Sequence, residues 1–193
     1  MDKRRFLAAA SATTVLPLIS AHAEVRPASG AGILTISGAI SRSNRGPLDP
    51  LLDPLLANQG VKFDKALVLD AAALLKLPAV KIQPVIYDEK PRELAGPLVT
   101  TVVEQAGVAL HPEVSLTLKA IDGYTVDLTL RDMRRIKMIV ATHMNGQPLT
   151  LGGFGPLWGV YEADKASDMQ DKPLKERFAL CPWGLYHIEV RGG

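Results

Sequence analysis

The chain has 193 residues, a formal net charge of +2, 47% hydrophobic residues and 22% charged residues. This length suits one domain, or one domain with a targeting segment, and it is long enough to bury a substantial core. A single cysteine excludes a disulfide framework within the chain and a cysteine-rich zinc or iron–sulfur site.

Residues 1–23 have the three parts of an export signal. Residues 3–5 are basic, residues 6–20 are mostly apolar, and Ala21-His22-Ala23 places small residues around a peptidase site. The apolar part is shorter than a membrane span requires. We therefore expect cleavage after Ala23 and export to the periplasm. The Sec and twin-arginine routes both remain open, because Lys3 stands where the twin-arginine pattern has its first arginine.

Removal of the signal changes the charge balance. Without residues 1–23 the chain carries equal numbers of basic and acidic residues and has no basic tract with interleaved aromatic residues. We therefore expect no nucleic-acid partner and no membrane span after the signal is removed. Cys181 has no partner within the chain, so it is either a buried hydrophobic residue or an intermolecular or reactive thiol.

The chain after the signal begins with a lead-in segment, residues 24–32, and continues as one domain, residues 33–193. Residues 34–40 alternate between apolar and polar side chains, which predicts a first strand with Gly38 as a bulge. Residues 41–60 are typical of a loop, in which each of two Asp-Pro pairs can open one helical turn.

This loop carries five leucines outside any periodic element, namely Leu48, Leu51, Leu52, Leu55 and Leu56. We expect them to fold back as a lid over the domain's own core. The alternative is an exposed apolar patch, which would mark a surface for a partner.

Strands and helices alternate over the middle of the chain. Residues 63–69 and 80–85 are predicted to be extended, and Asp70 between them is a good N-cap for a short helix that stops before Pro78. Gly96-Pro97 is expected to open the clearest helix, which carries one apolar face and ends at Gly107.

The remainder of the chain is rich in strands. Apolar residues with a period of two on both sides of Asp122-Gly123 predict a β-hairpin over residues 116–130. Asp132 is expected to cap a helical turn, and Asn145-Gly146 marks another tight turn. Further strands are expected at residues 138–141, 157–161 and 186–190, with a charged surface connection at 163–177. The pattern indicates an α+β fold, a single domain with mixed sheets and short helices.

Several segments recur, in this order, in a known family. They are the strand at 34–40, the capped helix at 70–78, Glu93-Leu94-Ala95-Gly96-Pro97-Leu98, Asp122-Gly123-Tyr124, Asn145-Gly146-Gln147-Pro148-Leu149, Gly155-Pro156-Leu157-Trp158 and residues 183–190. Over most of residues 33–190 the chain therefore resembles the molybdopterin-binding domain of the sulfite oxidase family, in its short, stand-alone, exported form.

The resemblance implies a molybdopterin cofactor, but this chain lacks the cysteine that ligates the metal in that family. Enzymes of that family hold molybdenum through a cysteine thiolate, which lies shortly before the helix that Gly96-Pro97 is expected to open. Here that region, residues 80–90, contains no cysteine, and Cys181 lies near the other end of the chain. A soft thiolate retains the metal and tunes its chemistry. We therefore assign no metal ligand and no catalytic residue, and we expect no cofactor, with bound molybdopterin as the alternative.

The resemblance also places the family's cofactor cavity among the loops that join the strands. Two such loops are the turn at Asp122-Gly123-Tyr124 and the stretch 155–161. The candidate ligand-binding residues are Asp122, Tyr124, Trp158 and Tyr161, because aromatic surface with a few polar groups suits a small-molecule site. The alternatives are that Tyr124 and Trp158 are core residues and that Asp122 only forms the turn.

Two functions from different classes follow. The first is a periplasmic, non-catalytic ligand-binding or accessory protein that keeps the family's scaffold and takes a small-molecule ligand or a periplasmic protein partner. The second is a molybdopterin-dependent oxidoreductase with unusual metal ligation.

The export signal generates the first testable prediction. N-terminal sequencing of the periplasmic form should begin at Glu24-Val25-Arg26, because small residues at 21 and 23 fit the signal peptidase. A periplasmic protein that retains residues 6–20 would contradict this prediction.

Overall fold

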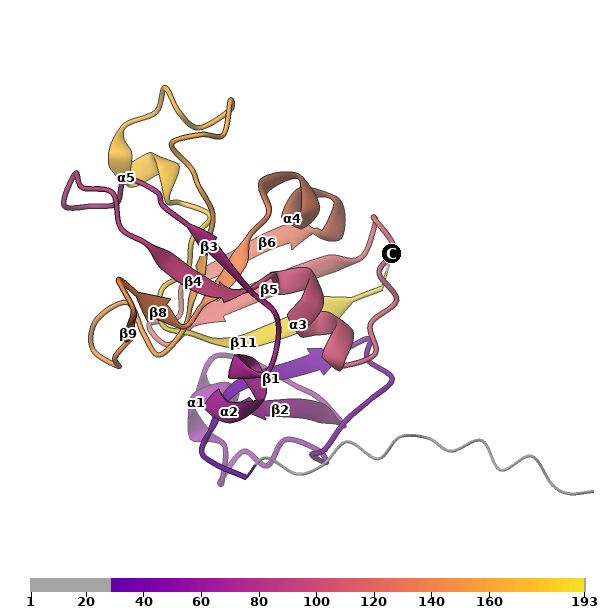
Figure 1. Ribbon diagram of the computed structural model, residues 1–193. Helices are drawn as coiled ribbons and strands as arrows, with labels where there is room; N and C mark the ends of the chain where they lie inside the picture. Colours follow the sequence, from indigo (N-terminus) through magenta and orange to yellow (C-terminus); the bar gives the residue numbers. More distant parts are fainter. Residues whose placement is uncertain (1–28, 193) are drawn as a thin grey trace, which may run out of the picture.

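The computed structural model describes residues 29–192, whose sheets and helices are drawn in Figure 1. The expected export signal, its cleavage point at Ala23 and most of the lead-in segment 24–32 lie outside the described residues. Within residues 29–192, no helix is both long enough and apolar enough to cross a membrane.

The largest sheet has five strands in the order β2-β1-β11-β5-β6. These strands are β1 (Gly32–Gly38), β2 (Ala66–Asp70), β5 (Ser115–Ala120), β6 (Thr125–Thr129) and β11 (Leu185–Arg191). β1 and β11 run parallel, whereas the other neighbours are antiparallel. The first and last strands of the domain therefore lie side by side inside one sheet (Figure 1).

Two smaller sheets complete the β structure. A four-stranded sheet in the order β3-β4-β8-β9 contains β3 (Ala79–Ile82), β4 (Leu94–Pro97), β8 (His143–Met144) and β9 (Gln147–Pro148). β7 (Ile139–Ala141) pairs with β10 (Trp158–Val160). β4 approaches β7 so closely that a Cβ at Gly96 would lie 1.9 Å from the carbonyl oxygen of Val140.

The helices are short: α1 (Pro54–Asn58), α2 (Ala71–Leu75), α3 (Val99–Gln105), α4 (Leu130–Ile136) and α5 (Leu174–Arg177). Asp70 caps α2, because its carboxylate accepts a hydrogen bond from the N–H of Ala73 at 2.7 Å. Mixed sheets with short helices confirm the expected α+β class.

Two helix starts differ from the expectation. Gly96-Pro97 does not open a helix but ends β4, because close contact with β7 keeps this segment extended, and α3 begins at Val99. The cap of α4 is Thr129 rather than Asp132. Asp132 instead stands at the third helical position and completes a capping box with Thr129.

The main core lies between one face of the five-stranded sheet and the smaller sheets with α3 and α4. It is built from alternating apolar residues of the strands and the inner faces of the helices, including Leu34, Ile36, Leu116, Leu118, Ile188, Val102, Val103, Met133 and Val140. Cys181 belongs to this core and is 2% exposed, as expected for a small buried hydrophobic residue.

The leucine-rich loop does not form the expected lid. Leu56 packs in a small second core with Val61 and Tyr186, and Leu48 lies against it. Leu51 and Leu52 are instead 89% and 80% exposed, and Leu55 is also exposed. The carboxylate of Asp49 accepts hydrogen bonds from the N–H groups of Leu51 and Leu52, and the turn that results directs these two residues outward. The expectation of a lid is therefore wrong for three of the five leucines.

A buried histidine lies between β1 and β5. The Nε2 atom of His187 is 2.9 Å from the hydroxyl of Ser37, and its Nδ1 atom has no hydrogen-bond partner among the described residues. Burial lowers the pKa of His187 to about 4, and the charge of Lys119 on the neighbouring strand adds to the effect. The imidazole is therefore neutral near neutral pH.

This histidine predicts that stability falls in mild acid. Its pKa in the unfolded chain is about 6.5, so the unfolded chain takes up the proton first as the pH falls. The neutral, buried His187 should therefore contribute its full stabilisation above pH 6.5. The free energy of unfolding should fall by about 3 kcal/mol as the pH approaches 4. Urea denaturation at several pH values would measure this loss.

A paired substitution isolates the histidine from the carboxylates that also titrate. His187→Gln should flatten the dependence between pH 7 and 4.5, whereas replacement of the exposed His111 by glutamine should leave it unchanged. An equal pH dependence in the parent protein and His187→Gln would show that His187 does not cause it.

Candidate functional site

Trp158, one of the candidate ligand-binding residues, lies in the core. Its side chain is fully buried and stacks on Phe154 at a centroid distance of 4.5 Å, with Tyr87 and Phe178 around it. Its indole Nε1 donates to the carbonyl oxygen of Cys181 at 3.1 Å. The ring therefore has its polar group satisfied within the protein and offers no exposed face to a ligand.

Asp122 and Tyr124 lie together at the hairpin turn between β5 and β6. The carboxylate of Asp122 accepts from the N–H of Tyr124 at 2.9 Å, which is the bond of a turn-forming aspartate. Tyr124 is about half exposed, and its hydroxyl donates to the carbonyl oxygen of Ala179 at 2.6 Å. Neither residue lines either of the two hollows beside β3, so a ligand-binding role for this turn stays a prediction.

Tyr161 borders the larger of two neighbouring hollows, a cleft of about 610 Å³. Val80, Lys81 and Ile82 of β3 form one wall, residues 135–137 at the end of α4 form another, and residues 161–167 complete it. Tyr161 itself is 1% exposed and lies at the base of the cleft, where burial raises the pKa of its hydroxyl. We call this hollow the β3–α4 cleft.

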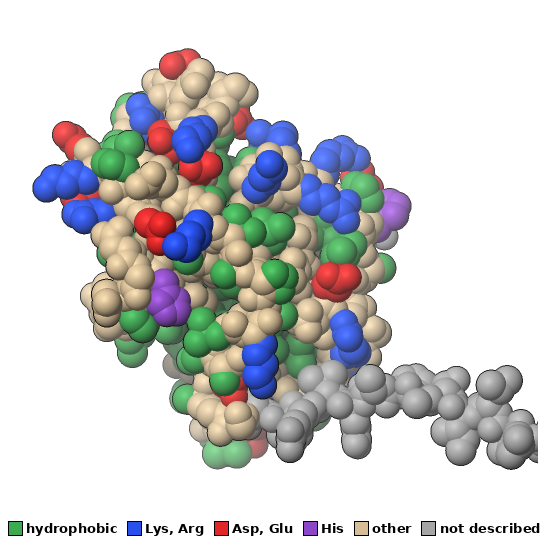
Figure 2. Space-filling view, in the orientation of Figure 1, with side chains coloured by type: hydrophobic (Ala, Val, Ile, Leu, Met, Phe, Trp, Pro, Cys, Tyr) green, Lys and Arg blue, Asp and Glu red, His purple; other side chains and the backbone are tan. Residues whose placement is uncertain are grey.

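Basic side chains dominate the β3–α4 cleft. Its lining contains Lys81, Arg135, Lys137 and Lys165 but one carboxylate, Glu162. Figure 2 shows several basic side chains on the face of the molecule that carries β3 and α4. The cleft therefore favours ligands with negative charge.

Most of these cations already have partners at the rim. Lys81 pairs with Glu93 at 2.9 Å, and Lys165 pairs with Glu162 at 2.5 Å. Burial would raise the pKa of Glu162, but hydrogen bonds from Lys165 and from the N–H of Gln83 lower it below its usual value. Lys137 forms no ion pair among residues 29–192.

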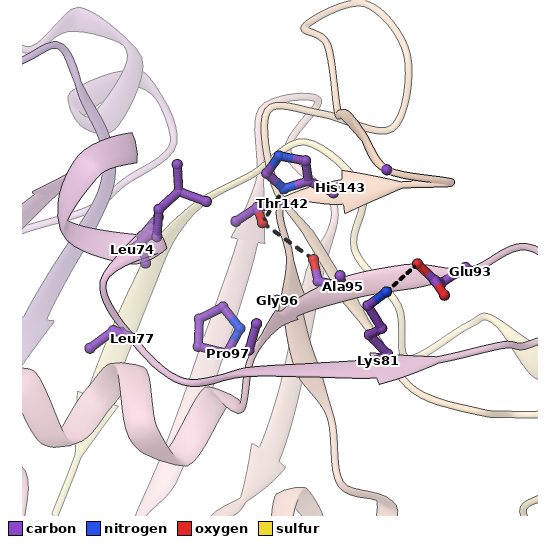
Figure 3. A pocket seen from close by; sticks show the side chains of 12 residues that line it. Leu74, Leu77, Lys81, Glu93, Ala95, Gly96, Pro97, Thr142 and His143 are labelled. Carbon is purple, nitrogen blue, oxygen red and sulfur yellow. Dashed lines mark hydrogen bonds and ion pairs between the residues drawn. The ribbon is translucent and has the colours of Figure 1, made fainter.

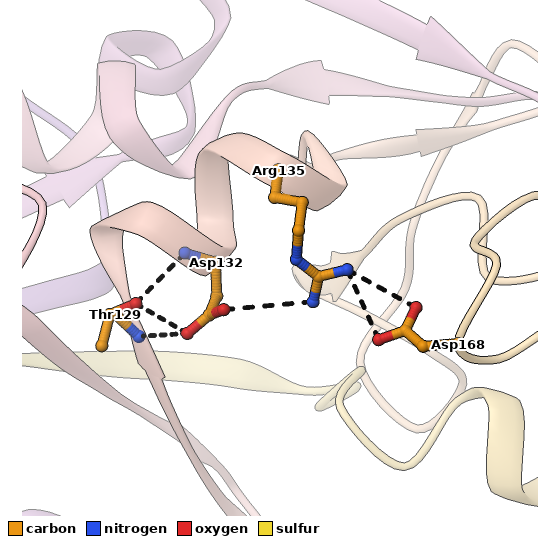
Figure 4. Close-up of polar contacts among 4 residues, drawn as sticks. All are labelled: Thr129, Asp132, Arg135 and Asp168. Carbon is orange, nitrogen blue, oxygen red and sulfur yellow. Dashed lines mark hydrogen bonds and ion pairs between the residues drawn. The ribbon is translucent and has the colours of Figure 1, made fainter.

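Arg135 connects two walls of the cleft (Figure 4). Its guanidinium lies 3.9 Å from Asp132 on its own helix and 3.4 Å from Asp168 on the connection that follows β10. Asp132 is in turn fixed by the capping box with Thr129. The arginine therefore ties the end of α4 to the segment that forms the opposite wall.

A smaller hollow of about 290 Å³ is lined by residues of β3, β4 and the segment after β7 (Figure 3). Its walls are mostly apolar and include Leu74, Leu77 and Pro97. Thr142 and His143 add polar groups, with the Thr142 hydroxyl 2.9 Å from the His143 Nδ1 atom. Lys81 lines both hollows, so one side chain of β3 reaches two potential sites.

The chain's only thiol is not placed as a metal ligand. Cys181 is buried, and desolvation raises its pKa well above the usual range, which keeps the thiol protonated. Within residues 29–192, no three His, Cys, Asp or Glu side chains are grouped to hold a metal ion. These residues therefore do not fit a molybdenum centre held by a thiolate.

The sequence pattern indicates one residue of the cleft but not the positive charge of its lining. Tyr161 was a candidate, whereas Lys81, Lys137 and Lys165 were not singled out. Each of these lysines is isolated in the sequence, and the folded chain brings them together. Residues 134–137, with three cations just after the capping box, are the only local signal that could have pointed to the site.

Comparison with known proteins supports the fold. No protein-family model and no curated protein sequence matches the chain. Among solved structures, the sulfane dehydrogenase SoxCD from Paracoccus pantotrophus is similar over 81% of this chain, with a TM-score of 0.51 and 12% identity. The chain spans 37% of the length of that protein chain. At this identity the similarity concerns the fold alone.

Burial of the thiol predicts slow chemical modification. Iodoacetamide should alkylate Cys181 at least about a hundredfold more slowly in the native protein than in urea, because only an opened chain exposes the thiolate. As a control, Ser167→Cys combined with Cys181→Ser places a thiol at an exposed residue of the cleft, and it should react rapidly. Fast labelling of native Cys181 would contradict its assignment to the core.

Proposed function

We propose that this protein is an exported, non-catalytic binding or accessory protein that uses the β3–α4 cleft to hold a ligand or a protein partner in the periplasm. The observation that carries the proposal is that the β3–α4 cleft is open and lined by cations, whereas the thiol of Cys181 is buried in the core. A scaffold can retain its pocket after the original chemistry is lost, because fold and function are separable.

The dimensions and lining of the cleft support a binding role. A volume of about 610 Å³ lies within the range of ligand pockets. Ile82 and Tyr161 provide buried apolar surface, while Lys137 and Glu162 provide polar groups of both signs. Three separate segments form the walls, and the ion pairs of Arg135 connect two of them.

The position of Cys181 supports the non-catalytic reading. The family that the sequence resembles holds its metal through a thiolate, and here residues 80–90 contain no thiol. Cys181 packs beside Trp158 and Phe178 and is protonated, so it could ligate a metal only after the core opened. We derive no reaction step through a molybdenum centre.

The second candidate is a molybdopterin-dependent oxidoreductase with unusual ligation. The similarity in fold to the sulfane dehydrogenase SoxCD favours it. The cations of the β3–α4 cleft would then serve the anionic groups of the cofactor rather than a separate ligand.

Metal analysis and native mass spectrometry of protein purified from the periplasm separate the two candidates. We expect less than about one molybdenum per ten chains, since no thiolate is available to hold it. We also expect the same metal content in Cys181→Ser, because a buried thiol makes no contribution to metal binding. One molybdenum per chain would overturn the non-catalytic proposal and favour the oxidoreductase.

A further inference from the structure

β3 has a free edge. In the order β3-β4-β8-β9 it is bonded on one side only, to β4. The pairing of β3 with β4 sets Lys81 opposite Ala95. The carbonyl oxygen of Ala95 accepts from the N–H of Thr142 at 2.9 Å, so the backbone groups of Ala95 point toward β8. Lys81 and Ala95 are therefore a non-hydrogen-bonded pair, and the N–H and C=O of Lys81 point away from the sheet.

The next outward-facing group along this edge already binds a carboxylate. The N–H of Gln83, two residues beyond Lys81, donates to the Oε1 atom of Glu162 at 3.1 Å. The edge thus shows one carboxylate contact made by the protein itself, from Glu162 in the segment 161–167 that also lines the cleft. The outward N–H and C=O of Lys81 have no hydrogen-bond partner among residues 29–192.

This edge borders the β3–α4 cleft rather than packed protein. Val80, Lys81 and Ile82 form a wall of the cleft, and the wall across from them begins at the end of α4. A chain lying in the cleft could therefore pair with β3 on one side and meet Lys137 on the other.

We propose that the free edge of β3 is the docking site for an extended, acidic peptide segment of a partner protein, which binds in the β3–α4 cleft as an added strand. Strand addition supplies affinity through main-chain hydrogen bonds and specificity through alternate side chains. This inference rests on the proposed binding function, because it names the kind of partner for the same cleft.

The positive charge of the β3–α4 cleft favours an acidic peptide over a second copy of the chain. Lys137 forms no ion pair within residues 29–192, although its charge acts on Glu162. The pairs of Lys81 and Lys165 are exposed ion pairs that contribute little, so a ligand carboxylate can replace Glu93 or Glu162. A second copy of the chain fits less well. Pairing of β3 with itself would bring the lysines of two clefts together, and like charges on adjacent strands repel.

Peptide selection followed by variants tests the proposal. A phage library of random ten-residue peptides is selected against the purified protein, and the enriched peptide is labelled for fluorescence anisotropy. The enriched sequences should alternate, with Asp or Glu at every second position. Lys137→Glu should weaken binding at least about tenfold, whereas Lys62→Glu, an exposed lysine that does not line the cleft, should not.

The main-chain contact is tested separately from the charge. Lys81→Pro removes the outward N–H but spares the bonds that Val80 and Ile82 make with β4, because proline is tolerated on edge strands. It should bind the peptide at least about tenfold more weakly than Lys81→Ala, which lacks the charge but keeps the N–H. In the unmodified protein, hydrogen exchange of the Lys81 amide should slow when peptide is bound, which keeps the test valid if Lys81→Pro does not fold.

Three results would overturn the inference: no enriched peptide, enriched peptides without acidic residues, or no added protection of the Lys81 amide. Binding that is lost in Lys137→Glu while the Lys81 amide stays unprotected would also overturn strand addition but leave a binding role for the cleft. Stoichiometric molybdenum, by contrast, would overturn the proposed function itself.

Discussion

The pairing of the first strand with the last is the constraint on which the rest of the structure depends. β1 and β11 run parallel in the middle of the five-stranded sheet, and Gly38 permits it, since a Cβ there would lie 2.0 Å from the carbonyl oxygen of Val190. β11 also pairs with β5, so the last strand connects the first strand to the β5–β6 hairpin. The smaller sheets and helices α3 and α4 share one hydrophobic core with this sheet. The contacts are long-range in sequence, a topology in which loop-closure entropy slows folding.

Features that depend on local chemistry could be predicted from the sequence. Asp70 caps α2 because a short acidic side chain can reach a backbone N–H three residues on. The turn at Asn145-Gly146 forms because both residues take positive φ angles of 49° and 76°. The failed expectation at Gly96-Pro97 has a tertiary cause. Proline suits the first turn of a helix, but the close approach of Val140 holds this segment in a strand.

The candidate site was harder to predict because it depends on long-range neighbours. The alternation around Trp158 indicates a strand but cannot say whether a ring faces a ligand or Phe154. The β3–α4 cleft combines segments about 55 and 80 residues apart, and its lysines have no common motif. Leu51 and Leu52 are exposed because hydrogen bonds to the Asp49 carboxylate form a turn that directs them outward. No periodic pattern in the sequence indicates the direction of this turn.

Lys81 lies at the border between the two hollows beside β3. Its side chain lines both the apolar hollow near His143 and the cationic cleft, and its ion-pair partner Glu93 lines the first of these. A molecule that binds the Lys81 ammonium in one hollow removes that charge from the other hollow. Thermodynamic reciprocity then requires each occupant to change the other's affinity by the same factor. A single flexible side chain on an edge strand can thus couple two sites without movement of the sheet.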